Sequence, residues 1–386
     1  MNTNSIPFSD AAPVVDGDLA EQALPGHGIA SQDPDSAAQV ALNHQESARE
    51  ADSVLTGGGL VAGAAAGAVI GVAVGGPVGV VVGATIGAVA GALGGAAAGT
   101  TANLEGSTGG DDTPDDAVWL HIEDSGGTGR PVVLIHGWPL SAEAWEAQVP
   151  ALQAAGYRVV AYDRRGFGRS DKPASGYSYD SLADDLQRVM DQCKLQDVTL
   201  VGFSMGGGEV ARYIARHGQS RLHCVVFAAG VPPYLMKTAD NPEGPLTPEI
   251  ALQKKRALEQ DRHAFFDQFT KDFFSANDVL EVNESVRGVA MNLCHQSAQH
   301  AALACMDSFS TTDFRDDLKK VTVPTLVIHG EADAIVPFES SGLRTHHAVP
   351  QSKLVTVGGA PHGLNQTHAL AFNGALLSFM QAQVVR

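Results

Sequence analysis

Ser204 is the residue of this chain whose surroundings point most directly to chemistry. It is the central residue of GFSMG (202–206), a G-x-S-x-G motif between the apolar run 198–203 and the helix-like run 205–217. Glycines at both ends of such a motif permit the sharp strand-to-helix turn that leaves the serine hydroxyl exposed. We therefore predict that Ser204 is a catalytic nucleophile.

A serine hydroxyl is a weak nucleophile until a base takes its proton, and a histidine oriented by a carboxylate is the usual base. Asp333 and His362 each come just after a strand-like apolar run, in the chain order serine, acid, histidine. We predict a triad of Ser204, Asp333 and His362. Glu331 and Asp313 are alternative acids that are less well placed after a strand.

The oxyanion that forms during acyl transfer needs preorganised N–H donors. The backbone N–H of Met205, directly after the nucleophile, is one candidate. The loop HGWP (136–139) follows an apolar run and should supply the second. We predict the Trp138 N–H for this role, because Pro139 has no N–H to give. We also expect Trp138, Pro139 and Phe203 to contact the substrate.

Other side chains near these motifs have more ordinary interpretations. His136 and His329 each precede a glycine at the end of a strand-like run, and we expect both to be structural. A stripe of aromatic residues at i, i+4 and i+8 favours the core of a helical region over a substrate wall. Its members are Phe265, Phe269 and Phe273.

The elements that must position these residues follow from alternating apolar runs and amphipathic stretches. Near-continuous apolar runs are typical of strands buried on both faces, so the pattern predicts a doubly wound, mostly parallel α/β sheet within 117–386. The stretch of about 231–318 has helical periodicity and no strand-like run, which predicts an inserted helical cap. The expected strands are 117–124, 131–137, 157–163, 198–204, 222–229, 324–330 and 353–359.

Three segments precede this region. Residues 1–52 are polar and acidic and read as largely disordered, and residues 105–116 read as a linker. Residues 53–104 carry no charge, and glycine recurs at every fourth position from Gly59 to Gly99. This spacing places the glycines on one helical face, as in glycine-zipper segments. A membrane hairpin, self-association into a homo-oligomer and a low-complexity linker are the three interpretations of 53–104.

Composition limits the partners and the compartment. The net charge is −18, and 14 acids against one base in residues 1–116 account for most of it. An acidic chain does not attract phosphate backbones, so we expect no nucleic-acid partner. The first residues lack the features of a secretory signal, and the four cysteines include no C-x-x-C pair. We expect a cytoplasmic protein with reduced, buried thiols, unless 53–104 associates with a membrane.

The longer motifs resemble one family. VVLIHGWPLSAEAW, DRRGFGRSDKP, VGFSMGGGEVARYIARHG, PTLVIHGEADAIVPF and GGAPHGLNQTH are similar to the cofactor-free bacterial haloperoxidases, which are α/β-hydrolases also described as arylesterases and perhydrolases. The resemblance covers about 117–386 and not the first 116 residues. It implies the triad and the two oxyanion amides named above, and no metal, haem or flavin.

The resemblance also implies a reaction. An ester or short carboxylic acid acylates the serine; water then gives hydrolysis, whereas hydrogen peroxide gives a peracid that oxidises halide away from the enzyme. Members that favour peroxide are similar in carrying a proline beside the oxyanion tryptophan, as Pro139 does here. Two alternatives stay open: a lactonase or C–C bond hydrolase with the same triad, and a membrane-associated or self-assembling scaffold whose hydrolase domain is inactive.

Overall fold

A computed structural model describes residues 118–383, so the segments predicted for 1–52, 53–104 and 105–116 lie outside the described residues. The centre is a sheet of seven strands in the order β1-β3-β2-β4-β5-β8-β9. Every neighbouring pair is parallel except β1 with β3. The strands are β1 (Ile122–Asp124), β2 (Pro131–Ile135), β3 (Arg158–Tyr162), β4 (Val198–Phe203), β5 (Leu222–Ala228), β8 (Thr325–Gly330) and β9 (Lys353–Val357).

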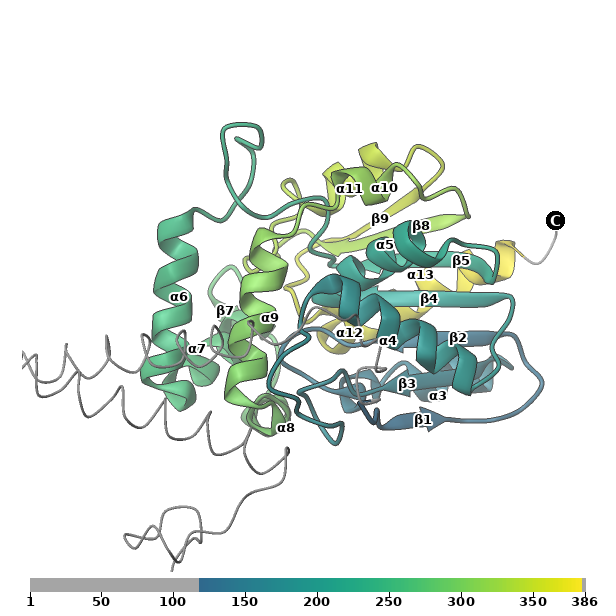
Figure 1. Ribbon diagram of the computed structural model, residues 1–386, viewed down its shortest axis with the longest axis horizontal. Coiled ribbons are helices and arrows are strands. Elements are labelled where there is room, and N and C mark those ends of the chain that lie inside the picture. Colours follow the sequence, from purple (N-terminus) through teal and green to yellow (C-terminus); the bar gives the residue numbers. More distant parts are fainter. Residues whose placement is uncertain (1–117, 384–386) are drawn as a thin grey trace, which may run out of the picture. The chain divides into compact units, whose positions relative to one another are not determined.

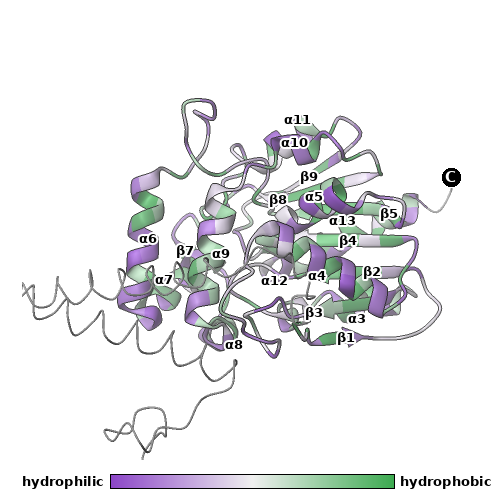
Figure 2. Ribbon diagram, in the orientation of Figure 1, coloured by the Kyte–Doolittle hydropathy of each residue, from purple (hydrophilic) through white to green (hydrophobic). Residues whose placement is uncertain are grey.

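The central strands form where the sequence is apolar on both faces. All residues of β4 and β8 are buried, as a strand covered by helices on both sides requires. Figure 2 shows hydrophobic colour along the sheet and hydrophilic colour on outward turns of α4 (Tyr179–Gln192). The prediction of a mostly parallel α/β sheet is confirmed. The first strand is shorter than expected, beginning at Ile122.

Helices cover both faces of the sheet (Figure 1). α4 and α5 (Met205–His217) lie in front of the sheet in this view, and α13 (Ala369–Ala382) lies behind it. Gln148, just before α3 (Val149–Ala154), hydrogen-bonds Asn373 on α13 at 3.0 Å, so the start of α3 lies beside α13. The shorter elements are a 3₁₀ turn (Ala142–Trp145), α10 (Arg315–Leu318), α11 (Gly342–Ala348) and α12 (Leu364–Thr367).

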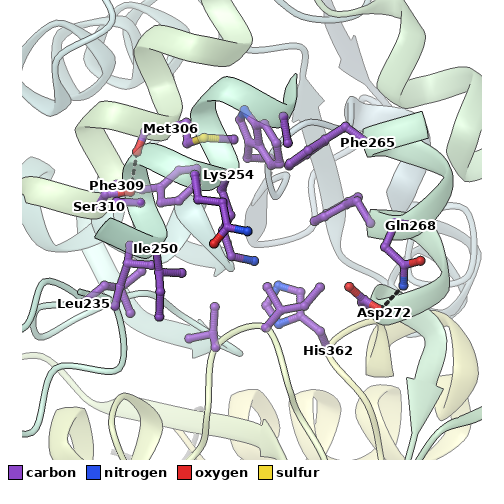
Figure 3. A pocket seen from close by; sticks show the side chains of 18 of the residues that line it. Leu235, Ile250, Lys254, Phe265, Gln268, Asp272, Met306, Phe309, Ser310 and His362 are labelled. Carbon is purple, nitrogen blue, oxygen red and sulfur yellow. Dashed lines mark hydrogen bonds between the residues drawn. The ribbon is translucent and has the colours of Figure 1, made fainter. Parts of the chain in front are cut away.

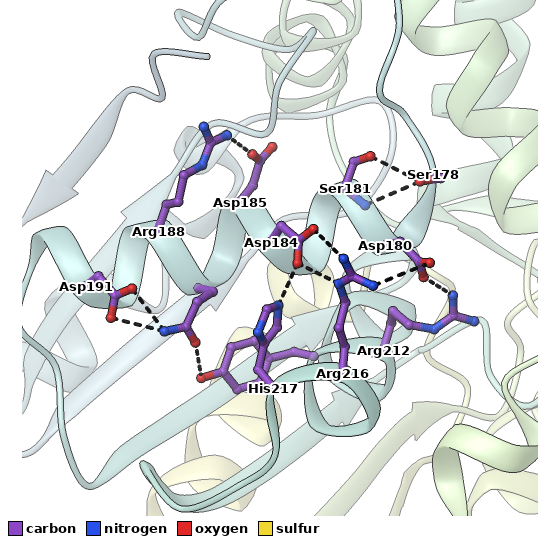
Figure 4. A network of polar contacts seen from close by, with 12 residues as sticks. Ser178, Asp180, Ser181, Asp184, Asp185, Arg188, Asp191, Arg212, Arg216 and His217 are labelled. Carbon is purple, nitrogen blue, oxygen red and sulfur yellow. Dashed lines mark hydrogen bonds and ion pairs between the residues drawn. The ribbon is translucent and has the colours of Figure 1, made fainter. Parts of the chain in front are cut away.

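Ion pairs join α4 to α5, the helix that begins directly after Ser204 (Figure 4). Asp184 accepts from Arg216 at 2.6 Å and from His217 at 2.7 Å, and Arg212 pairs with Asp180. Each exposed pair contributes about 0–1 kcal/mol. Together they hold α5 in register against α4. Because α5 begins directly after Ser204, these pairs also help to position the nucleophile.

A helical cap is inserted between β5 and β8, as predicted. Its helices are α6 (Pro248–Gln260), α7 (Arg262–Phe274), α8 (Glu284–Gln296) and α9 (Gln299–Thr311). The expectation of no strand in this stretch is wrong, because β6 (Ser275–Ala276) pairs with β7 (Val279–Leu280). Two-residue strands are too short to leave an alternating pattern in a sequence. None of the helices within 118–383 is long and apolar enough to cross a membrane.

The four cysteines are unpaired, as predicted. Cys224, Cys294 and Cys305 are buried, and Cys193 is half-buried. Burial raises the pKa of Cys224 to about 11 and that of Cys305 to about 12. These thiols stay protonated and unreactive at neutral pH.

Candidate active site

Ser204 occupies a tight turn between β4 and α5. Its φ of 54° and ψ of −117° form a strained conformation that non-glycine residues rarely adopt. The turn closes because the flanking glycines have no side chain. A Cβ on Gly202 would collide with the backbone oxygen of Gly206, and one on Gly206 would lie 2.6 Å from the oxygen of Ile135. The motif therefore produces the turn that its glycines predicted.

The three side chains of the predicted triad lie within hydrogen-bonding distance of one another. His362 Nε2 is 2.9 Å from Ser204 Oγ, and His362 Nδ1 is 2.7 Å from Asp333 Oδ2. A carboxylate oxygen accepts, so Nδ1 carries the proton and Nε2 is free to accept from the serine hydroxyl. Asp333 follows β8 and His362 follows β9, at the same edge of the sheet as Ser204.

The alternative acids lie elsewhere. Asp313 pairs with Arg315 at 2.6 Å, and Glu331 is exposed. Asp333 is the acid that contacts His362.

Asp333 is a fully buried carboxylate surrounded by donors. Its Oδ1 accepts from the backbone N–H groups of Ile335 at 2.9 Å and Val336 at 2.8 Å. Burial alone raises the pKa of Asp333, but the charge of His362 and hydrogen bonds from His329 and His362 outweigh burial and hold it well below its ordinary value. Asp333 is therefore ionised throughout the neutral range, as the partner of a charged imidazole must be.

Two backbone N–H groups are available for an oxyanion. Met205 is the first residue of α5, where N–H groups have no partner within the helix. Trp138 follows β2. Among the described residues, neither N–H donates a hydrogen bond to another protein atom. A Cβ on Gly137 would lie 3.1 Å from the Ser204 Cβ, so the Trp138 loop passes directly beside the nucleophile.

Gly137 has a steric role that was not predicted when the loop HGWP was assigned to the oxyanion site. A Cβ at this position would also lie 2.8 Å from a ring carbon of Phe203, which is closer than Cβ atoms approach. Gly137→Ala is expected to displace the Trp138 loop and lower kcat/KM for ester hydrolysis about a hundredfold, the effect of misplacing a group by about 1 Å.

The matched control for Gly137→Ala is Gly288→Ala, because a Cβ at Gly288 in α8 meets nothing within 4 Å. Steady-state kinetics and thermal melting of both variants separate lost catalysis from lost folding. Equal kcat/KM values for Gly137→Ala and wild type would contradict the steric role of Gly137.

A buried network holds the Trp138 loop in place. Arg164 donates from its backbone N–H to His136 Nε2 at 2.9 Å and from Nη2 to the His136 oxygen at 2.6 Å, and its Nε donates to buried Glu209 at 2.6 Å. His136 Nδ1 therefore carries a proton and donates to the Gly137 oxygen at 2.8 Å. Burial and then Arg164 lower the pKa of His136 to about 3, so it is neutral and structural, as expected.

Ser204 and His362 border a cavity of about 710 Å³ between the sheet edge and the cap. Figure 3 shows Met306 and Phe309 across the cavity from His362. Besides Ser204 and His362, the polar lining comes from α9, from α6 and α7, and from the residue between α6 and α7: Ser310, Gln253, Lys254, Gln260, Asp261, Gln268 and Asp272. The bulkier apolar lining residues include Trp138, Met205, Val231, Leu235, Leu246, Ile250, Phe265, Phe269, Met306, Phe309, Ile335 and Val336.

The lining corrects several sequence-based expectations. Phe265 and Phe269 line the cavity and contact the Trp138 ring edge-on, so only Phe273 of the stripe belongs to the buried core. Phe203 was expected to contact substrate, but it is not among the lining residues. Its ring is buried against those of His362, Phe273 and Trp145.

The two residues of the Trp138–Pro139 pair differ in placement. Trp138 lines the cavity, as expected, and its ring N–H donates to the Ala302 oxygen on α9 at 3.0 Å. Pro139 is buried and does not line the cavity, contrary to its expected substrate contact. Any effect of Pro139 on the reaction must therefore act through the adjacent backbone.

Comparisons with known proteins agree with this geometry. Residues 130–369 match the family model described as alpha/beta hydrolase fold. A crystal structure of bromoperoxidase from Bacillus anthracis is 54% identical, with a TM-score of 0.67 over 68% of this chain and 96% of that one. A non-heme chloroperoxidase of Kitasatospora aureofaciens is 39% identical over 69% of this chain and 98% of its own. A bifunctional esterase/perhydrolase of Acinetobacter calcoaceticus is 38% identical over 70% and 99%.

Proposed function

The chain belongs to the α/β-hydrolase family, within its non-heme haloperoxidase and perhydrolase branch, and from this we propose that it forms an acyl-enzyme on Ser204. The chain is a hydrolase enzyme with relatives named as esterase/perhydrolase and chloroperoxidase. The proposed substrates are small esters and short carboxylic acids. Water and hydrogen peroxide are the proposed acceptors of the acyl group.

One observation carries the proposal: a buried Ser204–His362–Asp333 relay opens into a cavity lined by aromatic and aliphatic side chains. The strained backbone conformation of Ser204 costs free energy of folding. Such strain is typical of functional sites, which supports a catalytic role for the serine that borders the cavity. The scaffold alternative, with an inactive hydrolase domain, does not account for the intact relay. A lactone could enter the same cavity, and the relay does not distinguish it from an open ester.

The acylation step uses the groups of the relay in turn. Ser204 Oγ attacks the substrate carbonyl carbon while His362 Nε2 takes the hydroxyl proton, and Asp333 stabilises the imidazolium that forms. The oxygen that becomes negative accepts hydrogen bonds from the Trp138 and Met205 N–H groups. The tetrahedral intermediate collapses, His362 returns the proton to the leaving alcohol or water, and the acyl group remains on Ser204.

The second step decides the product. His362 takes a proton from water or hydrogen peroxide, whose oxygen attacks the acyl carbon and releases Ser204, which recovers its proton. Water yields a carboxylic acid, and peroxide yields a peracid. The peracid oxidises halide outside the protein, so the haloperoxidase activity is indirect and needs no halide site.

Pro139 is proposed to favour peroxide over water. Its ring fixes φ and removes the N–H, which determines where the neighbouring backbone points beside the oxyanion site. Pro139→Leu is expected to lower the ratio of peracetic acid formation to p-nitrophenyl acetate hydrolysis several-fold, measured on one preparation. An unchanged ratio would refute this role.

The acyl-enzyme proposal is tested with a serine-directed fluorophosphonate. We expect the reagent to attach to Ser204, identified by peptide mass spectrometry, and to abolish ester hydrolysis and peroxide-dependent bromination with the same rate constant. Labelled enzyme that still forms brominating peracid would show that the two activities do not share Ser204.

A further inference from the structure

A second histidine, His329, faces the same carboxylate oxygen as His362. His329 lies in β8, and its side chain is completely buried. Its Nε2 lies 2.8 Å from the Val336 oxygen and 3.1 Å from Asp333 Oδ2, the oxygen that accepts from His362. The His-Gly pair at the end of β8 was expected to be structural, so the contact with Asp333 was not predicted.

The hydrogen-bonding role of His329 follows from its partners. A carbonyl oxygen and a carboxylate oxygen can only accept, so Nε2 must carry a proton and share it between Val336 and Asp333. Nδ1 has no partner among the described residues, and a Cβ added to Gly342 would lie 2.5 Å from it. A proton on Nδ1 would therefore be a buried donor without a partner.

His329 also links Asp333 to the wall of the cavity. The Val336 N–H donates to Asp333 Oδ1, and the Val336 oxygen accepts from His329. His329 therefore closes a ring of contacts from the carboxylate through the loop 333–336 and back to β8. Ala334, Ile335 and Val336 of this loop line the cavity.

Few other charges act on this part of the site. The groups that lower the pKa of Asp333 are His362 and His329. His329 also packs against the Phe338 ring. The rings of Phe203 and Phe273 cover His362, and the charged residues lining its cavity are Lys254, Asp261 and Asp272.

We propose that His329 is a positioning residue that fixes the Asp333 carboxylate and, by sharing its charge, sets the pH above which His362 acts as a base. The inference rests on the proposed function. A carboxylate that donates part of its electron density to His329 holds the His362 imidazolium less tightly. Losing the His329 donor leaves more charge for His362, which then keeps its proton to higher pH.

Three substitutions test this role. His329→Leu removes the donor, and His329→Asn places its amide near Nδ1, from which it does not reach Asp333. Both are expected to move the acid limb of the kcat/KM profile upward by about half to one pH unit. His329→Gln places an amide N–H near Nε2 and is expected to restore the wild-type limb. The substrate is p-nitrophenyl acetate, and rates are divided by active sites counted by burst titration.

The control is His346→Leu, a half-buried histidine in α11 that bonds Ser352 at 2.7 Å and does not contact the triad. It is expected to keep the wild-type limb. A merely structural His329 would lower the fraction of active sites and the melting temperature in all three variants without moving the limb, and that result would overturn the inference. If Ser204→Ala stays active, the proposed function fails instead, whatever the His329 variants do.

Discussion

Replacing Ser204 with alanine is expected to lower kcat for ester hydrolysis about a million-fold, to the residual rate that binding and the oxyanion donors alone supply. The same substitution should remove peroxide-dependent bromination, because both reactions pass through one acyl-serine. The reason is geometric: Ser204 is the only hydroxyl within hydrogen-bonding distance of His362 Nε2 among the described residues.

The Ser204→Ala measurement needs both assays on one folded preparation. Initial rates of p-nitrophenyl acetate hydrolysis and of monochlorodimedone bromination in acetate are compared with wild type, and circular dichroism with thermal melting verifies the fold. The substitution does not change the backbone strain at position 204, because alanine has the same Cβ as serine at a φ of 54°. Loss of hydrolysis with retained bromination would separate the two chemistries and refute the shared intermediate.

Asp333→Asn is expected to lower kcat about ten-thousandfold while changing KM little. Asparagine fills the same space, but it removes the charge that stabilises the His362 imidazolium and can hold the ring in the wrong tautomer. Because Asp333 has a pKa well below its ordinary value, wild type keeps this charge down to strongly acidic pH. The acid limb of the wild-type profile therefore does not belong to Asp333.

The controls for Asp333→Asn are the two other acids that the sequence allowed. Asp313→Asn and Glu331→Gln alter side chains that do not contact His362, and each is expected to keep kcat within about twofold of wild type. The three variants are compared by kcat, KM and melting temperature. A large loss in Asp313→Asn or Glu331→Gln, or activity within tenfold of wild type in Asp333→Asn, would contradict the assignment of the acid.

The fold was predictable because its signal is local and repeated. Every strand of the seven-stranded sheet except β1 coincides with an apolar run, and parallel strands buried on both faces leave such runs without alternation. The pair β6–β7 was not predictable, since two residues carry no period. Strand ends were also less certain than strand centres, and β1 begins at Ile122 because only its last residues pair with β3.

The site was predictable where the chain order fixes it. Ser204, Asp333 and His362 each follow a strand, and the topology brings the strand ends to one edge. Contacts that depend on side-chain direction were not predictable. Phe203 points into the core instead of the cavity, and Phe265 points into the cavity instead of the core, although both are phenylalanines within apolar patterns.

The contact between His329 and Asp333 could not be predicted from the sequence. The distance between His329 and Asp333 depends on how the loop 333–336 folds back over the end of β8. A loop conformation of this kind leaves no periodic pattern in the sequence. A histidine in an otherwise apolar strand is a buried polar group that needs partners, and that requirement was the available signal. It predicts that partners exist and does not say that one of them is the acid of the triad.

The most direct test of the central claim is to trap the acyl group on Ser204. Enzyme turning over p-nitrophenyl acetate is quenched in acid, digested and mapped by mass spectrometry, with and without hydrogen peroxide. We predict an acetyl group on the peptide that contains Ser204, and a lower acetylated fraction when peroxide is present and peracetic acid accumulates. Peracetic acid formed at an undiminished rate by enzyme that never carries an acetyl group on Ser204 would contradict the account.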